Sequence, residues 1–129
     1  MNSEFFTDPP ARVQQARIAM ARAESRIALE FGPLDPACNT TAIGMAFMNL
    51  EDVYPPYPPL LDIDPSPDPR ADIAAAIRLL GQATAEAERV ADIVRYAATI
   101  CDLYDLDLLA DGPSDQVDPG TGGWSGQWP

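Results

Sequence analysis

The sequence predicts an all-α protein: two long antiparallel helices and a shorter buried helix, held by a proline-rich strap and completed by dimerisation into a helical bundle. Three observations predict this fold class. Apolar residues recur at steps of three and four along most of the chain, the period that keeps side chains on one face of an α-helix. Helix start and stop signals bound these stretches. Proline-rich segments, in which neither a helix nor an internal strand can form, separate them.

The composition fits a single helical domain at residues 1–112, followed by a tail at residues 113–129 that is rich in Gly, Asp and Ser. The 129 residues are enough for one core, and a hydrophobic content of 47% is too high for a disordered chain. All eight basic residues are arginine, a usage typical of a GC-rich bacterial genome.

A net charge of −12 at pH 7 argues against binding to nucleic acid or to an anionic membrane surface, because both would be repelled. The charge is uneven, since four of the eight arginines lie between Pro9 and Phe31. We expect this first helix to pair with the acidic remainder of the chain or with another copy, and we expect salt to weaken that pairing.

The first helix is expected to begin at the Asp-Pro-Pro run of residues 8–10 and to end near Phe31. Asp accepts hydrogen bonds from the first free amides of a helix, and Pro has no N–H to leave unpaired there. Gly32 and Pro33 stop the helix. Its apolar face is formed by Val13, Ala16, Met20, Ala23, Ile27 and Phe31.

A shorter helix is expected between Ala37 and Val53, after a second Asp-Pro signal at residues 35–36. Thr40 or Thr41 is an alternative first residue, and Gly44 weakens the case for an unbroken helix. Its apolar residues point in nearly all directions: Ile43, Met45, Ala46, Phe47, Met48, Leu50 and Val53. A helix that is apolar on most sides is usually buried, so we expect it to lie under or across the other two.

The segment from Tyr54 to Pro69 has seven prolines in 16 residues and is expected to run extended, as a strap. Its apolar side chains are expected to pack on the helices: Tyr54, Tyr57, Leu60, Leu61 and Ile63. The run from Pro55 to Pro59 also suggests a ligand for adaptor domains with aromatic grooves, but the basic residue that such grooves require is absent. A structural strap is the favoured interpretation.

The long helix is expected to run from Asp68 to Gly112. Asp68 and Pro69 repeat the start signal, and Gly112 followed by Pro113 is a stop signal. The predicted apolar stripe consists of Ile73, Ala76, Ile77, Leu80, Ala83, Ala87, Val90, Ile93, Val94, Ala97, Ile100, Cys101 and Tyr104. The opposite side carries Arg78, Gln82, Glu86, Arg89, Asp92, Tyr96 and Thr99.

This helix is the reason for expecting a homodimer. Alanine supplies ten of the 34 residues from Ala71 to Tyr104, which lets a second helix approach closely. At about 1.5 Å per residue the helix would be on the order of 55 Å long, more than the rest of the chain covers. Gly81 is its weakest point, where a close crossing or a mild bend is expected.

No catalytic or cofactor-binding motif is present in the sequence. The absence of histidine excludes a nucleophilic triad, and there is no glycine-rich phosphate loop or paired Glu-x-x-Glu motif. Aspartates at residues 62–68 and 102–111 offer oxygen ligands to hard cations but lack the pattern of a calcium loop. Solvated acidic surfaces are favoured, and we predict neither a metal nor a cofactor.

Two sets of residues are candidate sites. Polar and aromatic residues of the long helix and the strap form a candidate ligand-binding site: Tyr54, Tyr57, Arg89, Asp92, Arg95 and Tyr96. Ordinary surface pairs at helical spacing are the simpler interpretation of the helical members. Trp124 and Trp128 in the tail are candidate partner-binding residues, since a partner can bury their indoles.

The favoured function is a small acidic helical interaction or accessory protein without its own catalytic machinery. The alternative is a small helical enzyme or binding protein that acts on an apolar metabolite through the Asp, Arg and Tyr side chains, which requires a closed apolar pocket. Acidic mimicry of DNA is a third reading, opposed by the arginines of the long helix. No secretory signal or membrane-spanning run is seen, so we expect a cytoplasmic protein with Cys38 and Cys101 reduced, a disulfide being the alternative.

Overall fold

The computed structural model describes residues 6–31 and 40–106, and within them the chain forms four α-helices and no strand. The helices are α1 (Ala11–Phe31), α2 (Thr40–Leu50), α3 (Pro69–Glu86) and α4 (Val90–Tyr104). The predicted all-α class is confirmed for these residues. Cys38 and the tail with Trp124 and Trp128 lie outside the described residues.

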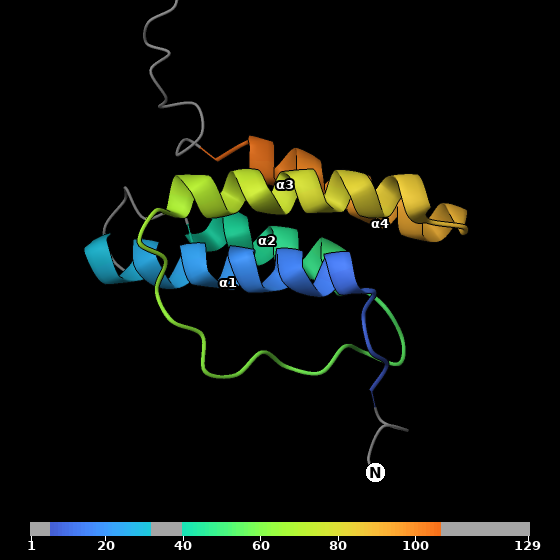
Figure 1. Cartoon of the computed structure of the whole chain (residues 1–129), viewed down its shortest axis with the longest axis horizontal. Coiled ribbons are helices and arrows are strands. Elements are labelled where there is room, and N and C mark those ends of the chain that lie inside the picture. The colour runs from blue at the N-terminus through green and yellow to red at the C-terminus, as the bar shows by residue number, and fades with distance from the viewer. Residues whose placement is uncertain (1–5, 32–39, 107–129) are drawn as a thin grey trace, which may run out of the picture.

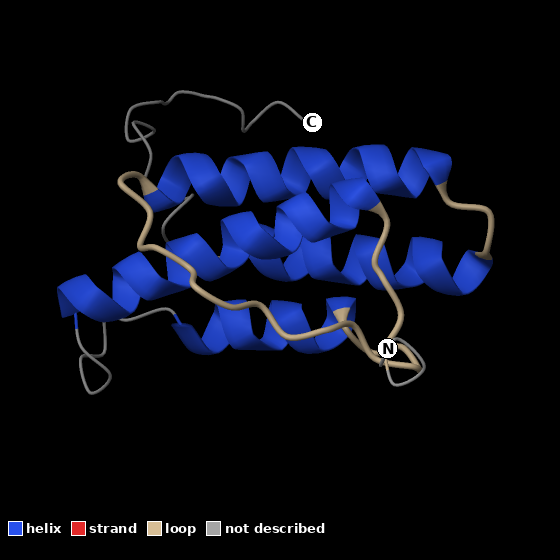
Figure 2. Ribbon diagram, turned by 60° about the horizontal axis from the view of Figure 1, so that its bottom comes forward, coloured by secondary structure: helices blue, strands red, loops and turns tan. Residues whose placement is uncertain are grey.

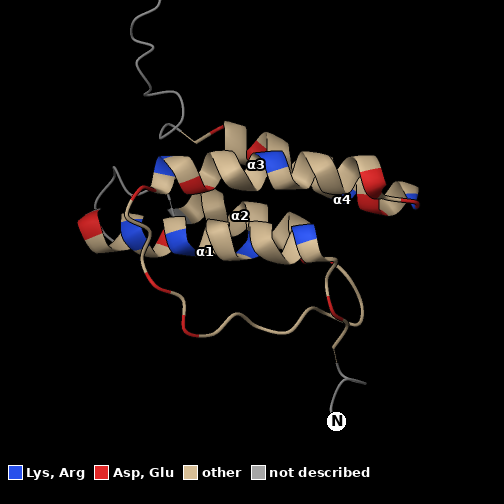
Figure 3. Cartoon of the chain, in the orientation of Figure 1, with Lys and Arg blue, Asp and Glu red and all other residues tan. Residues whose placement is uncertain are grey.

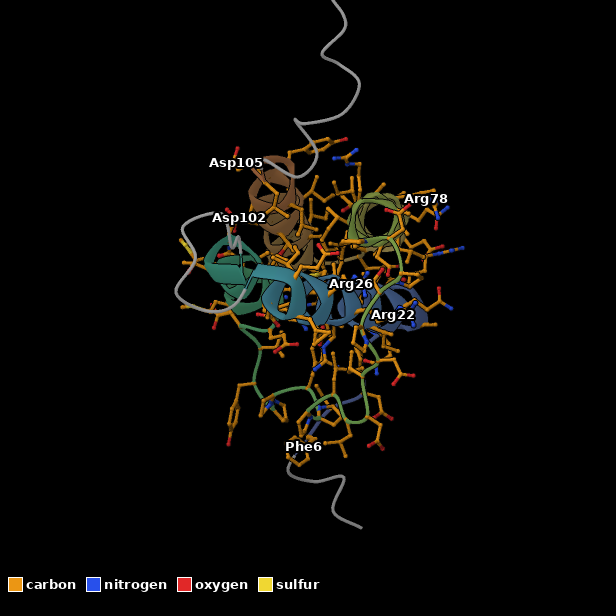
Figure 4. The ribbon with its side chains drawn as sticks, turned by 90° about the vertical axis from the view of Figure 1, so that its left-hand side faces the viewer. Phe6, Arg22, Arg26, Arg78, Asp102 and Asp105 are labelled. Carbon is orange, nitrogen blue, oxygen red and sulfur yellow. The ribbon has the colours of Figure 1, made fainter. Side chains whose placement is uncertain are left out.

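The helices form a bundle of two layers, in which α3 lies beside α1 and α4 lies beside α2 (Figures 1 and 4). A short link at residues 87–89 joins α3 to α4, so these two helices run antiparallel as a hairpin (Figure 1). The proline-rich strap runs beneath α1, on the side away from α3 (Figures 1 and 2). All four helices contribute to one core.

The predicted apolar face of α1 is buried wherever its side chains are described. Val13, Ala16, Met20, Ala23 and Ile27 are each at most 1% exposed. They pack with buried residues of the other helices: Ile43, Ala46, Leu50, Ile73, Ala76, Leu80, Ala83, Tyr96 and Leu103. The side chain of Phe31 is not among those described.

The prediction of one helix from Asp68 to Gly112 is wrong. Its start is as expected, because the Asp68 side chain accepts a hydrogen bond from the Ala71 amide at 3.2 Å and Pro69 occupies the first turn. The helix passes through Gly81, where a bend was expected, and ends at Glu86. Ala87 then adopts an extended conformation with ψ 142°.

The break has a tertiary rather than a local cause. Residues 87–89 are Ala, Glu and Arg, all of which favour helix, so propensity does not predict an end there. Leaving the helix at this point lets α4 turn back along α3 and bury Tyr96 and Leu103 in the same core as Leu80. Because α4 covers α3 within one chain, the length of the predicted helix no longer argues for a dimer.

The break also exchanges the buried and exposed sides of α4. The predicted apolar stripe continues through α4 as Val90, Ile93, Val94, Ala97, Ile100, Cys101 and Tyr104. All of these are exposed except Ile100, which is partly covered and packs against the core. Tyr96 and Thr99, predicted to face outward, are 3% and 0% exposed. The apolar stripe is therefore buried in α3 and faces solvent in α4.

The expectation that the middle helix is buried on most sides is also wrong. Ile43, Ala46 and Leu50 are fully buried, but Met45 and Met48 are 56% and 72% exposed. The helix lies at the edge of the bundle and packs chiefly on α4, so only one of its sides is covered.

The strap contacts α1 over part of its length. The Ser66 amide donates a hydrogen bond to the carbonyl oxygen of Arg22 at 3.0 Å, and Ser66 is buried. Tyr57, Leu60 and Ile63 are partly covered, as expected for residues that pack on the helices. Tyr54 and Leu61, expected to pack as well, are instead 95% and 75% exposed.

Arg17 joins three parts of the structure. Its side chain, 2% exposed, donates hydrogen bonds to Glu51 Oε2 at 2.6 Å, to Gln14 Oε1 at 2.7 Å and to the carbonyl oxygen of Pro58 at 2.8 Å. Its guanidinium carbon also lies 5.1 Å from the ring centre of Tyr57. One side chain of α1 thus connects this helix to the end of α2 and to the strap.

The arginines of α1 pair within the chain, which is one of the two pairings expected from the charge distribution. The pairs are Arg12–Glu86 at 2.9 Å, Arg17–Glu51 at 2.6 Å, Arg22–Asp72 at 3.3 Å and Arg26–Glu30 at 3.2 Å. Figure 3 shows basic residues along α1 and acidic residues on the strap and at helix ends. Two of these pairs connect α1 to α3, its main neighbour in the bundle.

Candidate functional site

A cleft of about 390 Å³ opens where three segments meet: the N-terminal arm at residues 7–10, residues 52–57 after α2, and the start of α4. We call it the tyrosine cleft. All six candidate ligand-binding residues line it: Tyr54, Tyr57, Arg89, Asp92, Arg95 and Tyr96. Their binding role stays a prediction. Thr7, Asp8 and Asp52 also line the cleft, and no sequence signal pointed to them.

Arg95 fixes the geometry of the cleft. It donates to Asp92 Oδ1 at 2.6 Å and to the carbonyl oxygen of Asp52 at 2.9 Å, so it ties α4 to the segment after α2. Its side chain is 14% exposed, and its Nε is buried without a hydrogen-bond partner among the described residues. Arg89 is held more loosely, because its Nε lies 3.8 Å from Asp92 Oδ2 and its side chain is 75% exposed. The spacing of three and four residues along α4 brings these groups together.

Two phenol groups face the cleft. The pKa of Tyr96 is raised to about 12, chiefly by burial and to a smaller extent by the nearby Tyr57 and Asp92. Burial also raises the pKa of Tyr57, and the charge of Arg95 partly offsets this. Neither hydroxyl forms a hydrogen bond with the described residues, and neither is closed off from solvent. Both phenols therefore stay protonated at neutral pH and are available to a ligand.

The lining of the cleft bears on both catalysis and binding. A tyrosine with a pKa near 12 releases its proton too reluctantly to act as a general base at neutral pH. Asp92 already accepts a hydrogen bond from Arg95. The cleft is open to solvent and most of its lining is polar, unlike the closed apolar pocket that an apolar metabolite requires. The lining favours a polar or charged ligand.

The two aspartate clusters are only partly described. In the described part of the chain, no group of three or more Cys, Asp or Glu side chains is placed to hold a metal ion. Asp102 accepts a hydrogen bond from the side-chain amide of Asn49, on the side of α4 that faces α2 (Figure 4). Asp107 and Asp111 of the same cluster lie outside the described residues.

A second surface is the exposed apolar face of α4. Val90, Val94 and Tyr104 are 74%, 60% and 62% exposed, and Ala97 and Cys101 lie between them on the same side. The charged residues within α4, Asp92, Arg95 and Asp102, are all partly covered instead. A surface helix normally has the reverse arrangement, so this face has the character of an interface. The sequence predicted that the chain would not cover the whole apolar stripe, but not that the uncovered part would be the α4 part.

None of the helices in the described ranges is long and apolar enough to cross a membrane. Comparison of the chain with models of protein families, with curated proteins and with solved structures finds no significant match. The proposals below therefore rest on the residues and contacts of this chain.

Proposed function

We propose that this protein is a small acidic helical interaction protein of the cytoplasm, without catalytic machinery of its own, and that it forms a homodimer through the exposed apolar face of α4. The observation that carries the proposal is that face: five small or apolar residues in a row along a helix whose charged residues are partly covered. The acidic remainder of the surface is then available to a partner, and a net charge of −12 favours a basic one.

The spacing of the exposed residues supports a helix as the occupant of this face. Val90, Val94, Ala97, Cys101 and Tyr104 follow each other at steps of four, three, four and three. This is the pattern of the seam in paired helices, where side chains of one helix fit between those of the other. Ala97 in the middle lets the two backbones approach closely.

The distribution of charge supports a second copy of the chain as the partner. Arg89, 75% exposed, lies at the start of the face, and the exposed Asp105 lies at its end. Two α4 helices in antiparallel orientation bring these opposite charges together at both ends, and the helix dipoles favour the same orientation. The arrangement is two-fold symmetric, as most homodimers are.

The size of the face predicts a weak dimer. A stable interface buries about 800 Å² on each partner, and one face of a helix about 22 Å long supplies less. The net charge of −12 on each copy opposes association. We therefore expect a dissociation constant on the order of micromolar or weaker.

Sedimentation equilibrium over a range of protein concentrations tests the proposal. The wild-type chain should dimerise, and Val94→Asp should be monomeric because it places a charge in the apolar seam. Val94 is 60% exposed, so this variant should keep the helical circular dichroism of the wild type. Leu61→Asp is the matched control, since Leu61 is a comparably exposed apolar residue of the strap. A monomeric wild type, or a Val94→Asp dimer as tight as the wild type, would overturn the proposal.

A further inference from the structure

We propose that the tyrosine cleft binds a small organic cation, with an alkylammonium group placed among the tyrosine rings. This goes beyond the proposed dimer: apart from Arg89, which lies at one end of the dimer face, the cleft residues lie on the partly covered or buried side of α4 or in other segments of the chain. The cleft volume, about 390 Å³, lies within the range of small-molecule sites, roughly 300–1,000 Å³.

Tyrosine rings supply the first part of the recognition. Tyr54, Tyr57 and Tyr96 all line the cleft, and the face of a tyrosine ring attracts a cation. Tyr54 is exposed and Tyr57 is partly covered, so these two rings supply the contact, whereas the Tyr96 ring is buried in the core. Tyr57 already has the guanidinium of Arg17 over its ring, at 5.1 Å from the ring centre. This ring therefore attracts a cation within the chain, and only its other face is left for a ligand.

Carboxylates supply the second part. The cleft is lined by three aspartates, Asp8, Asp52 and Asp92, and by two arginines. One of the arginines, Arg95, already donates hydrogen bonds to Asp92 and to the Asp52 carbonyl oxygen. The carboxylates of Asp8 and Asp52 have no hydrogen bond or ion pair with the described residues. A cation would balance them, whereas an anion would meet the repulsion of a chain with net charge −12. An apolar molecule would displace the water that hydrates these carboxylates and would offer no hydrogen bonds in its place.

Replacing Arg89 should change the affinity for a cation and for an anion in opposite directions. Arg89 is the more exposed of the two arginines at this cleft, since its side chain is 75% exposed, and it lies 3.8 Å from the Asp92 carboxylate. A bound ammonium group competes with it for the same carboxylate. Removing the charge by Arg89→Gln should therefore strengthen binding of a cation and weaken binding of an anion.

The test is a titration of the full chain with choline, followed by backbone amide chemical shifts. The neutral molecule of the same shape, 3,3-dimethylbutan-1-ol, and the anion acetate are the matched controls. Choline should give saturable shifts at the cleft, and neither control should. Saturation by the neutral molecule at the same concentration as choline, or by acetate instead of choline, would overturn the proposal.

Variants then assign the contacts. Tyr54→Ala should weaken choline binding about three- to tenfold, the loss expected for one cation–π contact. Asp52→Asn should weaken it about threefold, because it removes the free carboxylate but keeps the carbonyl oxygen that Arg95 uses. Both side chains are exposed, so neither change should unfold the protein, and Leu61→Ala is the control away from the cleft. Unchanged affinity in both variants, or weaker choline binding in Arg89→Gln, would contradict the assignment.

Discussion

Replacing Arg17 with alanine is expected to destabilise the fold by about 3–5 kcal/mol, the range for removing one partner of a buried ion pair. The side chain is 2% exposed and donates to Glu51, Gln14 and the carbonyl oxygen of Pro58. Its loss leaves these acceptors without a donor, at about 1–3 kcal/mol for each one that stays buried. Glu51 is 32% exposed and recovers part of its solvation, which places the expected value near 3 kcal/mol.

Urea unfolding followed by circular dichroism measures this change. Arg12→Ala is the matched control, because Arg12 also connects α1 to another helix but its pair with Glu86 is 42% and 59% exposed. Such exposed pairs contribute less than about 1 kcal/mol. Arg17→Lys keeps the charge but not the planar fork, and should fall between the two. The reasoning would be refuted if Arg17→Ala were no more destabilising than Arg12→Ala.

Three further predictions concern the core, the backbone and the alkaline limit of stability. Leu80→Ala should cost about 2–5 kcal/mol because Leu80 is fully buried, and Leu61→Ala in the strap should change the unfolding free energy by less than about 0.5 kcal/mol. Gly81→Ala should raise the unfolding free energy by about 0.5–1 kcal/mol, because an added Cβ meets nothing within 4 Å in the interior of α3; a lower value would show that the helix is strained there. The pKa of Tyr96 is about 12 in the folded chain, above the value of about 10 for an exposed tyrosine, so the unfolded chain loses this proton first as the pH rises. The stability that protonated Tyr96 contributes is complete below about pH 10 and is lost as the pH rises through about 12. Unfolding curves of Tyr96→Phe should therefore show a smaller loss of unfolding free energy over this interval.

Local signals predicted the elements whose ends are set locally. Asp68 and Pro69 begin α3 as expected, and the three- and four-residue steps of α1 identified its buried face. The link between α3 and α4 gives no such signal, because Ala87, Glu88 and Arg89 all favour helix. The chain leaves the helix there so that α4 can pack on α3, which only the assembled core determines.

The sequence likewise predicted only part of the candidate site. Helical spacing placed Arg89, Asp92, Arg95 and Tyr96 on neighbouring positions of one helix, and the structure brings Tyr54 and Tyr57 to the same cleft. Thr7, Asp8 and Asp52 were missed, since they reach it through contacts between segments far apart in sequence. The apolar stripe was predicted to be covered partly by the chain and partly by a second copy, but an apolar pattern does not show which part the same chain covers.

The rate at which Cys101 is alkylated tests the dimer through α4 most directly. Cys101 is an exposed free thiol within the proposed seam, and a Cys38→Ser background makes it the one thiol of the chain. The rate should fall as the protein concentration rises through the dimer dissociation constant, and it should stay fast at every concentration in Val94→Asp. A Cys101 rate that does not change while sedimentation shows a dimer would place the interface elsewhere and contradict the account.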